Sequence, residues 1–216
     1  MKAGMRICST FCVTALLLLA GCINMQPYDY TNYREHPPRS ILVLPPLNES
    51  TSVEGTYSYL STVTQPLAEL GYYVFPVAVV DQFLKENGMP TAGEMHNISL
   101  AKVAEITGAD AVLFVTLEQY GSKYQLISTT AVVKARAKLI DTRTGILLWE
   151  GQGMAQSSSS GSGNILADVI AAAITQAINS KTDAAHGVSR QANINLFYAR
   201  NRGLLYGPYS AKYRVN

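Results

Sequence analysis

The chain has 216 residues and a formal net charge of +2, from 17 lysine and arginine and 15 aspartate and glutamate residues, and a charge so close to zero excludes a general nucleic-acid binder. All three cysteines lie at or before Cys22, which excludes a disulfide within the folded part. No later stretch approaches 18 continuous apolar residues, so no second membrane crossing is expected.

The amino-terminal segment has the pattern of an export signal. Basic Lys2 and Arg6 precede an apolar run that is too short to span a bilayer, and small residues follow. The sequence Leu-Ala-Gly-Cys at residues 19–22 matches a lipoprotein box, in which the thiol of Cys22 accepts diacylglycerol. We therefore predict a lipoprotein signal peptide over residues 1–21 and a mature chain that begins at the lipid-modified Cys22. The alternative is an ordinary signal peptide with a chance cysteine.

The lipid attachment site determines the expected location. Several acyl chains, palmitate among them, hold a protein stably at a membrane because each buried methylene contributes about 0.8 kcal/mol. The next residue is Ile23 rather than aspartate, which favours the outer membrane under the sorting rule of enterobacteria. We expect a lipid-anchored outer-membrane protein that faces the periplasm. Residues 22–39 are polar and rich in proline and tyrosine, and are predicted to form a lipidated tether.

One domain is predicted over residues 40–180. Its first part is expected to alternate strands and helices, because near-continuous apolar runs are separated by segments with helical spacing. The predicted strands cover residues 41–44, 72–75 and 111–117, and the predicted helices cover about 60–70, 78–87 and 97 or 99 to 107. Pro66 predicts a kink or a break near residue 65 of the first helix.

The second part of this domain changes character. Residues 131–140 alternate apolar and basic side chains, which indicates a half-exposed strand. Asp141–Gly145 is predicted to form a hairpin turn with Gly145 at positive φ, and 146–149 to form the partner strand. A serine-rich connector and a helix over 164–179 should follow. The predicted fold class is α/β, a mixed β-sheet with a late antiparallel hairpin, flanked by helices.

The carboxyl-terminal extension, residues 181–216, is basic and aromatic. It carries six basic residues against Asp183 alone: Lys181, Arg190, Arg200, Arg202, Lys212 and Arg214. Two interpretations stay open: the extension lies on the acidic face of its own domain, or it contacts an acidic partner or anionic lipid. Ile194, Leu196 and Tyr198 recur at period two and predict a short strand. Arginine and aromatic residues together are typical of interface hot spots, and the predicted partner-binding residues are Arg200, Arg202, Tyr206 and Tyr209.

These features together resemble a known group of proteins. The segments that carry the resemblance are the lipoprotein box and Ile41–Ser50, Gly71–Pro76, Gly108–Ala111, Asp141–Trp149 and Leu205–Tyr209. The chain resembles a family of outer-membrane lipoproteins related to the curli secretion channel lipoprotein (CsgG-like) and to the TolB amino-terminal domain. The resemblance implies an α/β domain of that type, used for protein contacts in the envelope, and other envelope lipoproteins as partners, with a CsgG-like channel among the candidates.

No chemical motif points to catalysis. The three histidines, His36, His96 and His186, are not near other ligand residues at metal spacing, so no metal and no cofactor are expected. Nucleophile-elbow, zinc-protease and phosphate-loop motifs are not found. Trp149 is interpreted as a core residue rather than a binding anchor. We therefore expect a non-enzymatic binding or assembly component of an envelope complex. The alternative is an accessory subunit of a CsgG-like export channel, and homo-oligomerisation is left open.

Overall fold

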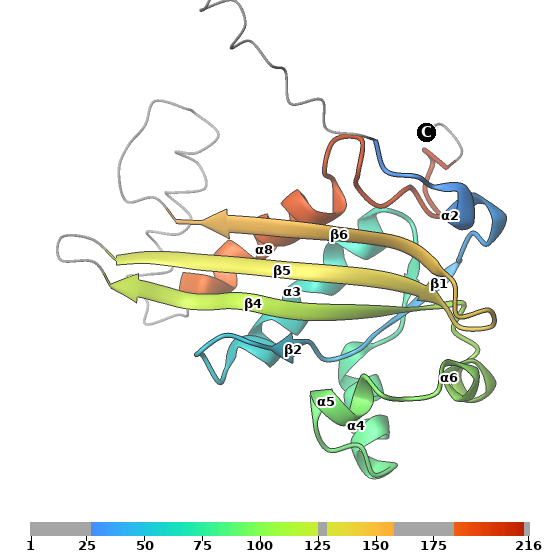
Figure 1. Ribbon diagram of the computed structural model, residues 1–216, viewed down its shortest axis with the longest axis horizontal. Helices are drawn as coiled ribbons and strands as arrows, with labels where there is room; N and C mark the ends of the chain where they lie inside the picture. The colour runs from blue at the N-terminus through green and yellow to red at the C-terminus, as the bar shows by residue number, and fades with distance from the viewer. Residues whose placement is uncertain (1–26, 125–128, 158–183, 214–216) are drawn as a thin grey trace, which may run out of the picture.

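The computed structural model describes residues 27–124, 129–157 and 184–213 and shows a mixed α/β fold (Figure 1). Its sheet has six strands in the order β3-β1-β4-β5-β6, and β2 pairs separately with β4. The strands are β1 Ser40–Val43, β2 Leu47–Asn48, β3 Tyr73–Val74, β4 Ala111–Tyr124, β5 Thr129–Asp141 and β6 Leu147–Gln156. The helices are α2 Thr31–Glu35, α3 Gly55–Glu69, α4 Val77–Glu86, α5 Ala92–Met95, α6 Leu100–Thr107 and α8 Ala184–Phe197. The predicted fold class is confirmed.

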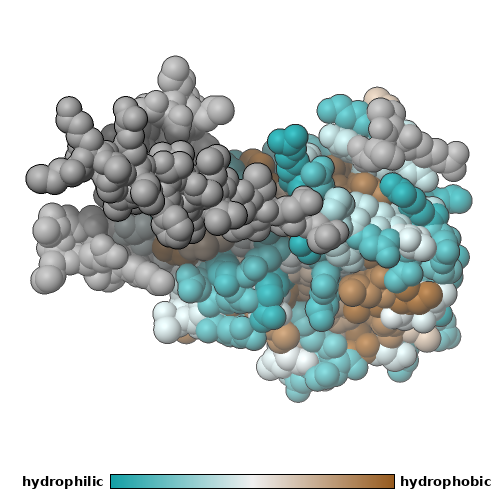
Figure 2. Space-filling view, turned by 45° about the horizontal axis from the view of Figure 1, so that its top comes forward, coloured by the Kyte–Doolittle hydropathy of each residue, from teal (hydrophilic) through white to brown (hydrophobic). Residues whose placement is uncertain are grey.

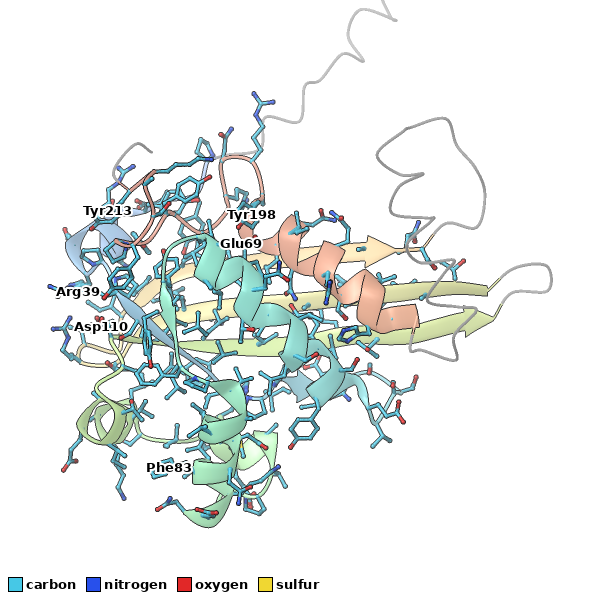
Figure 3. All side chains as sticks on the ribbon, turned by 180° about the vertical axis from the view of Figure 1, so that it is seen from behind. Arg39, Glu69, Phe83, Asp110, Tyr198 and Tyr213 are labelled. Carbon is cyan, nitrogen blue, oxygen red and sulfur yellow. The ribbon has the colours of Figure 1, made fainter. Side chains whose placement is uncertain are left out.

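The sheet is parallel at one side and antiparallel at the other. Strand β1 pairs in parallel with β3 and β4, as expected where helices connect the strands, and β4, β5 and β6 form an antiparallel ribbon. Helices α3 and α8 cover one face of the sheet, which is the face seen in Figure 3. Helices α4, α5 and α6 lie on the other side, next to β1 and β4 (Figure 1). The core therefore has two parts, one on each face of the sheet.

The alternating pattern of residues 131–140 is confirmed by β5. Its small and apolar residues at odd positions, Ala131, Val133, Ala135, Ala137 and Leu139, are buried against α8 and the rest of the core. The basic residues between them point to the face that α8 does not cover, where Lys134 and Arg136 both form ion pairs with Glu118. Strand β4 continues beyond its predicted end at residue 117 to Tyr124, because β5 pairs with it as far as Tyr124, with a register shift between Leu117 and Gln119.

The predicted hairpin turn is also confirmed. Gly145 has a φ of 72°, a conformation in which a side chain is strained. The Oδ1 of buried Asp141 accepts hydrogen bonds from the backbone N–H groups of Arg143 and Thr144 and from the Thr144 hydroxyl. The Asp-x-x-Thr-Gly sequence is thus a turn motif, in which the carboxylate replaces missing backbone partners.

The structure differs from two sequence predictions. Of the kink or break predicted near residue 65, the break does not occur, because helix α3 runs on through Pro66 to Glu69. Since Pro66 lies in the last turn, the helix loses one backbone hydrogen bond close to its end, and the Pro66 carbonyl still accepts from Leu70 N–H. Residues 194–198 do not form a strand, because they complete and follow α8. The residues that α8 buries recur at helical spacing, at Ala185, Val188, Ala192 and Leu196.

The predicted helix over 164–179 and the connector from residue 158 lie outside the described residues. None of the helices that the described ranges contain is long and apolar enough to cross a membrane.

Candidate functional site

The start of the described chain lies against the loop that follows α8, as the blue and red segments at the top of Figure 1 show. Tyr28 N–H donates a hydrogen bond to the Asn201 carbonyl over 3.0 Å. The Tyr30 hydroxyl donates to the Gly203 carbonyl over 2.5 Å. Two parts of the chain that are far apart in sequence are thereby fixed side by side.

The loop itself has a defined conformation that holds Arg200 and Arg202 outward. Asn201 has a φ of 60°, in the left-handed region, and Gly203 N–H donates back to the Ala199 carbonyl. The indole N–H of Trp149 donates to the Arg202 carbonyl over 2.9 Å. The ring of Trp149 is fully buried, so this hydrogen bond fixes the backbone of Arg202 while the Arg202 side chain stays exposed.

The segment after this loop is packed on the domain by backbone hydrogen bonds. Gly207 N–H donates to the Leu70 carbonyl and Tyr209 N–H to the Gly71 carbonyl, over 2.8 and 3.0 Å, and Leu204 is buried. Tyr206 is half-buried, with the Lys212 ammonium 5.4 Å from its ring centre, whereas the Tyr209 side chain is 70% exposed. The extension therefore lies on its own domain and still presents polar and aromatic side chains.

A cleft of about 640 Å³ lies between the start of the chain and this loop. Arg34 and Arg202 are its charged lining residues, and Tyr28, Tyr30 and Tyr206 contribute aromatic rings. Burial raises the pKa of both Tyr28 and Tyr30, so their hydroxyl groups stay neutral at physiological pH. The cleft combines two cations with uncharged tyrosine side chains and has no carboxylate in its lining, so its guanidinium groups suit an anionic group.

The four predicted partner-binding residues lie on this side of the molecule. Arg202 and Tyr206 line the cleft, and Arg200 and Tyr209 are exposed outside it. Arg34, Tyr28 and Tyr30 also line the cleft, although they belong to residues 22–39, for which the sequence predicts a tether.

The part of that segment described in the structure, Pro27–Arg39, packs on the domain instead of extending from it. Tyr33 is buried, and its hydroxyl group is hydrogen-bonded to that of Tyr72. Burial raises the pKa of Tyr33 to about 12. The one available signal was the density of tyrosine in a segment that would otherwise be a polar linker.

His96 has structural surroundings. His96 Nε2 lies 2.9 Å from the Pro45 carbonyl oxygen, and its ring packs edge-on against Phe114. Burial lowers the pKa of His96, so the ring is neutral near pH 7. Within the described ranges, no three histidine, cysteine, aspartate or glutamate residues are grouped as a metal site would require.

A second cavity, of about 260 Å³, lies between α4, α6 and β1 and is lined almost entirely by apolar residues, Phe75 and Phe83 among them. Phe83 lies at the opposite end of the molecule from Tyr213, which belongs to the extension (Figure 3). Figure 2 shows one face of the molecule, with hydrophobic residues gathered toward the right-hand end of that face and hydrophilic residues around them.

Comparison with known proteins gives consistent matches. Residues 28–209 match the sequence profile of the family described as "Putative lipoprotein GNA1162-like". The "Putative lipoprotein NMB1124/NMB1162" of Neisseria meningitidis serogroup B is 41% identical over 201 residues, which are 91% of this chain and 93% of that protein. The crystal structure of lipoprotein GNA1162 from Neisseria meningitidis is 42% identical, with a TM-score of 0.55, and the match covers 67% of this chain and 100% of that one.

Proposed function

Since the chain belongs to the GNA1162-like family of lipoproteins, we propose that it is an outer-membrane lipoprotein that acts as a non-enzymatic binding component of a complex in the cell envelope. Residues 1–21 are the signal peptide in this proposal, Cys22 carries the lipid, and the folded domain faces the periplasm. The observation that carries the binding role is the set of accessible arginine and tyrosine side chains on a carboxyl-terminal extension whose backbone is hydrogen-bonded to the domain. A surface that is already held in place loses little conformational entropy when a partner binds.

The lipid anchor has a direct test. Cys22→Ser is expected to abolish acylation and processing, because serine offers no thiol to accept diacylglycerol. Cys8→Ser/Cys12→Ser, which changes only the signal peptide, should be lipidated like the parent. Incorporation of radiolabelled palmitate in growing cells measures both variants. Equal labelling of the Cys22→Ser protein and the parent would reject the anchor.

The proposed protein-contact surface consists of Arg200, Arg202, Tyr206 and Tyr209, and other envelope lipoproteins are its expected partners. Deleting residues 203–216 is a poor test, because it removes buried Leu204 and the backbone donors at Gly207 and Tyr209. Point substitutions at exposed positions leave this packing in place. The test therefore uses substitutions of exposed side chains, which do not uncover any buried residue of the domain.

Arg200→Ala/Tyr209→Ala is expected to lose nearly all of the partner captured from intact cells by chemical crosslinking. Two hot-spot side chains that contribute about 2 kcal/mol each correspond together to an affinity that is weaker by roughly several hundredfold. The control, Arg143→Ala/Tyr73→Ala, removes one exposed arginine and one exposed tyrosine elsewhere on the surface. It should capture the partner like the parent. Undiminished capture by Arg200→Ala/Tyr209→Ala would reject this surface.

The channel alternative makes a different prediction about assembly. An accessory subunit of a CsgG-like channel would co-purify with that channel as a ring in detergent. The ion pairs that Glu118 forms with Lys134 and Arg136, on the open face of β4 and β5, favour an aqueous position for this ribbon. A charged ribbon of this kind does not suit a membrane-spanning part of a channel, so we propose the binding role ahead of the channel alternative.

A further inference from the structure

The position of the anchor limits how the domain can be oriented. Pro27 is five residues after Cys22, and a fully extended chain spans at most about 3.6 Å per residue, so the two residues lie at most about 18 Å apart. Tyr28 is hydrogen-bonded to the loop that carries Arg200 and Arg202. If Cys22 is acylated as proposed above, on which this inference rests, Tyr28, six residues after Cys22, lies at most about 22 Å from the acylated residue, and the surface around it lies close to the bilayer.

The charges of this surface suit an anionic membrane. Arg34 and Arg202 both line the cleft beside Tyr28, and no aspartate or glutamate lines it with them. Neither arginine forms an ion pair with any residue that the structure describes, unlike Arg136, which pairs with Glu118. Asp29 interacts electrostatically with Arg34, and Glu150 with Tyr28, but neither carboxylate lines the cleft or forms an ion pair with these arginines. Within the cleft, both guanidinium groups therefore face a ligand without a bound carboxylate.

The aromatic residues of the cleft add a second property of a membrane surface. Tyr28 and Tyr30 pack with their ring centres 4.9 Å apart and keep neutral hydroxyl groups. Rings with one polar end are favoured at the boundary between lipid and water. Guanidinium groups bind phosphate through paired, charge-assisted hydrogen bonds.

We propose that the cleft between Arg34 and Arg202 binds the phosphate-bearing headgroup of an anionic phospholipid in the membrane that anchors the chain. This face of the domain then rests on the bilayer beside the acylated cysteine. The proposal divides the contact surface into two parts. Arg202 and Arg34 bind lipid in this proposal. Arg200 and Tyr209 do not line the cleft and stay available to a protein partner.

The test measures vesicle binding without any acyl chain. The mature chain, residues 22–216, carries Cys22→Ser and is sedimented with vesicles of phosphatidylglycerol mixed with phosphatidylcholine, or of phosphatidylcholine alone. We expect binding only to the anionic vesicles, and we expect added salt to weaken it. A basic residue near an anionic surface contributes about 1 kcal/mol, so Arg34→Gln/Arg202→Gln should bind roughly 25-fold more weakly.

Two further variants control for charge and for folding. Arg143→Gln removes an exposed arginine that does not line the cleft and should bind like the parent. Arg34→Lys/Arg202→Lys keeps both charges and should retain binding to an intermediate degree, which a misfolded protein would not do.

Three results would overturn the proposal: equal binding to both kinds of vesicle, parental binding by Arg34→Gln/Arg202→Gln, or capture of a protein instead of lipid by a photocrosslinker at position 202 in cells. Failure of the anchor is seen separately, because the parent and Cys22→Ser would then be labelled equally by palmitate in cells, whatever the vesicles show.

Discussion

Trp149→Ala is expected to lower the free energy of unfolding by about 3–5 kcal/mol, the range for deleting a buried aromatic side chain. Trp149 is fully buried and stacks on Phe197 with ring centres 5.7 Å apart. Its indole N–H also holds the Arg202 carbonyl. The substitution therefore leaves a cavity under α8 and an unpaired carbonyl in the loop that shapes the candidate site.

Urea unfolding followed by circular dichroism measures this loss, since Trp149 is the only tryptophan and fluorescence would disappear with it. Trp149→Phe keeps much of the packing and removes the donor, so it should cost about 1–2 kcal/mol. Tyr209→Ala, at an exposed position, should stay within about 0.5 kcal/mol of the parent. A Trp149→Ala protein as stable as the parent would contradict the position of this ring in the core.

Gly153→Ala is expected to cost about 3 kcal/mol or more, although it adds a single methyl group. A β-carbon at Gly153 would lie 2.3 Å from the Ala192 carbonyl oxygen and 2.8 Å from the Leu196 nitrogen, both in the backbone of α8. A helix backbone cannot rotate away as a flexible side chain can, so α8 must shift from β6.

Gly145→Ala is the matched control. Gly145 has a positive φ, but nothing lies within 4 Å of the added carbon, so only the backbone strain of about 1 kcal/mol is expected. Melting temperatures of the two variants should therefore differ clearly. If both variants melt together, α8 does not approach β6 as closely as described.

The parts of the fold that could be predicted from the sequence are those that depend on a pattern of neighbouring residues. The alternation of residues 131–140 and the Asp-x-x-Thr-Gly turn can each be recognised from ten or fewer consecutive residues. The end of β4 could not be predicted in this way. Residues 118–124 have no regular alternation, and their strand conformation depends on pairing with β5. The close packing of α8 on Gly153 likewise depends on a tertiary contact, which no local pattern records.

The candidate site shows the same division. Arg200, Arg202, Tyr206 and Tyr209 were found because they are close together in the sequence and have interface composition. Arg34 was missed because it comes from the other end of the chain and reaches the cleft only when the first residues pack beside the loop after α8.

The contact between residues 28–30 and 201–203 also bears on the order in which the chain folds. Tyr28 and Tyr30 form hydrogen bonds with Asn201 and Gly203, which are synthesised 173 residues later. If the chain is exported amino-terminus first and acylated at Cys22, as proposed above, Cys22 crosses the membrane well before residues 201–203. Under that proposal the lipid can be attached before this last contact has formed. The incompletely packed chain is then exposed to chaperones and proteases for an interval.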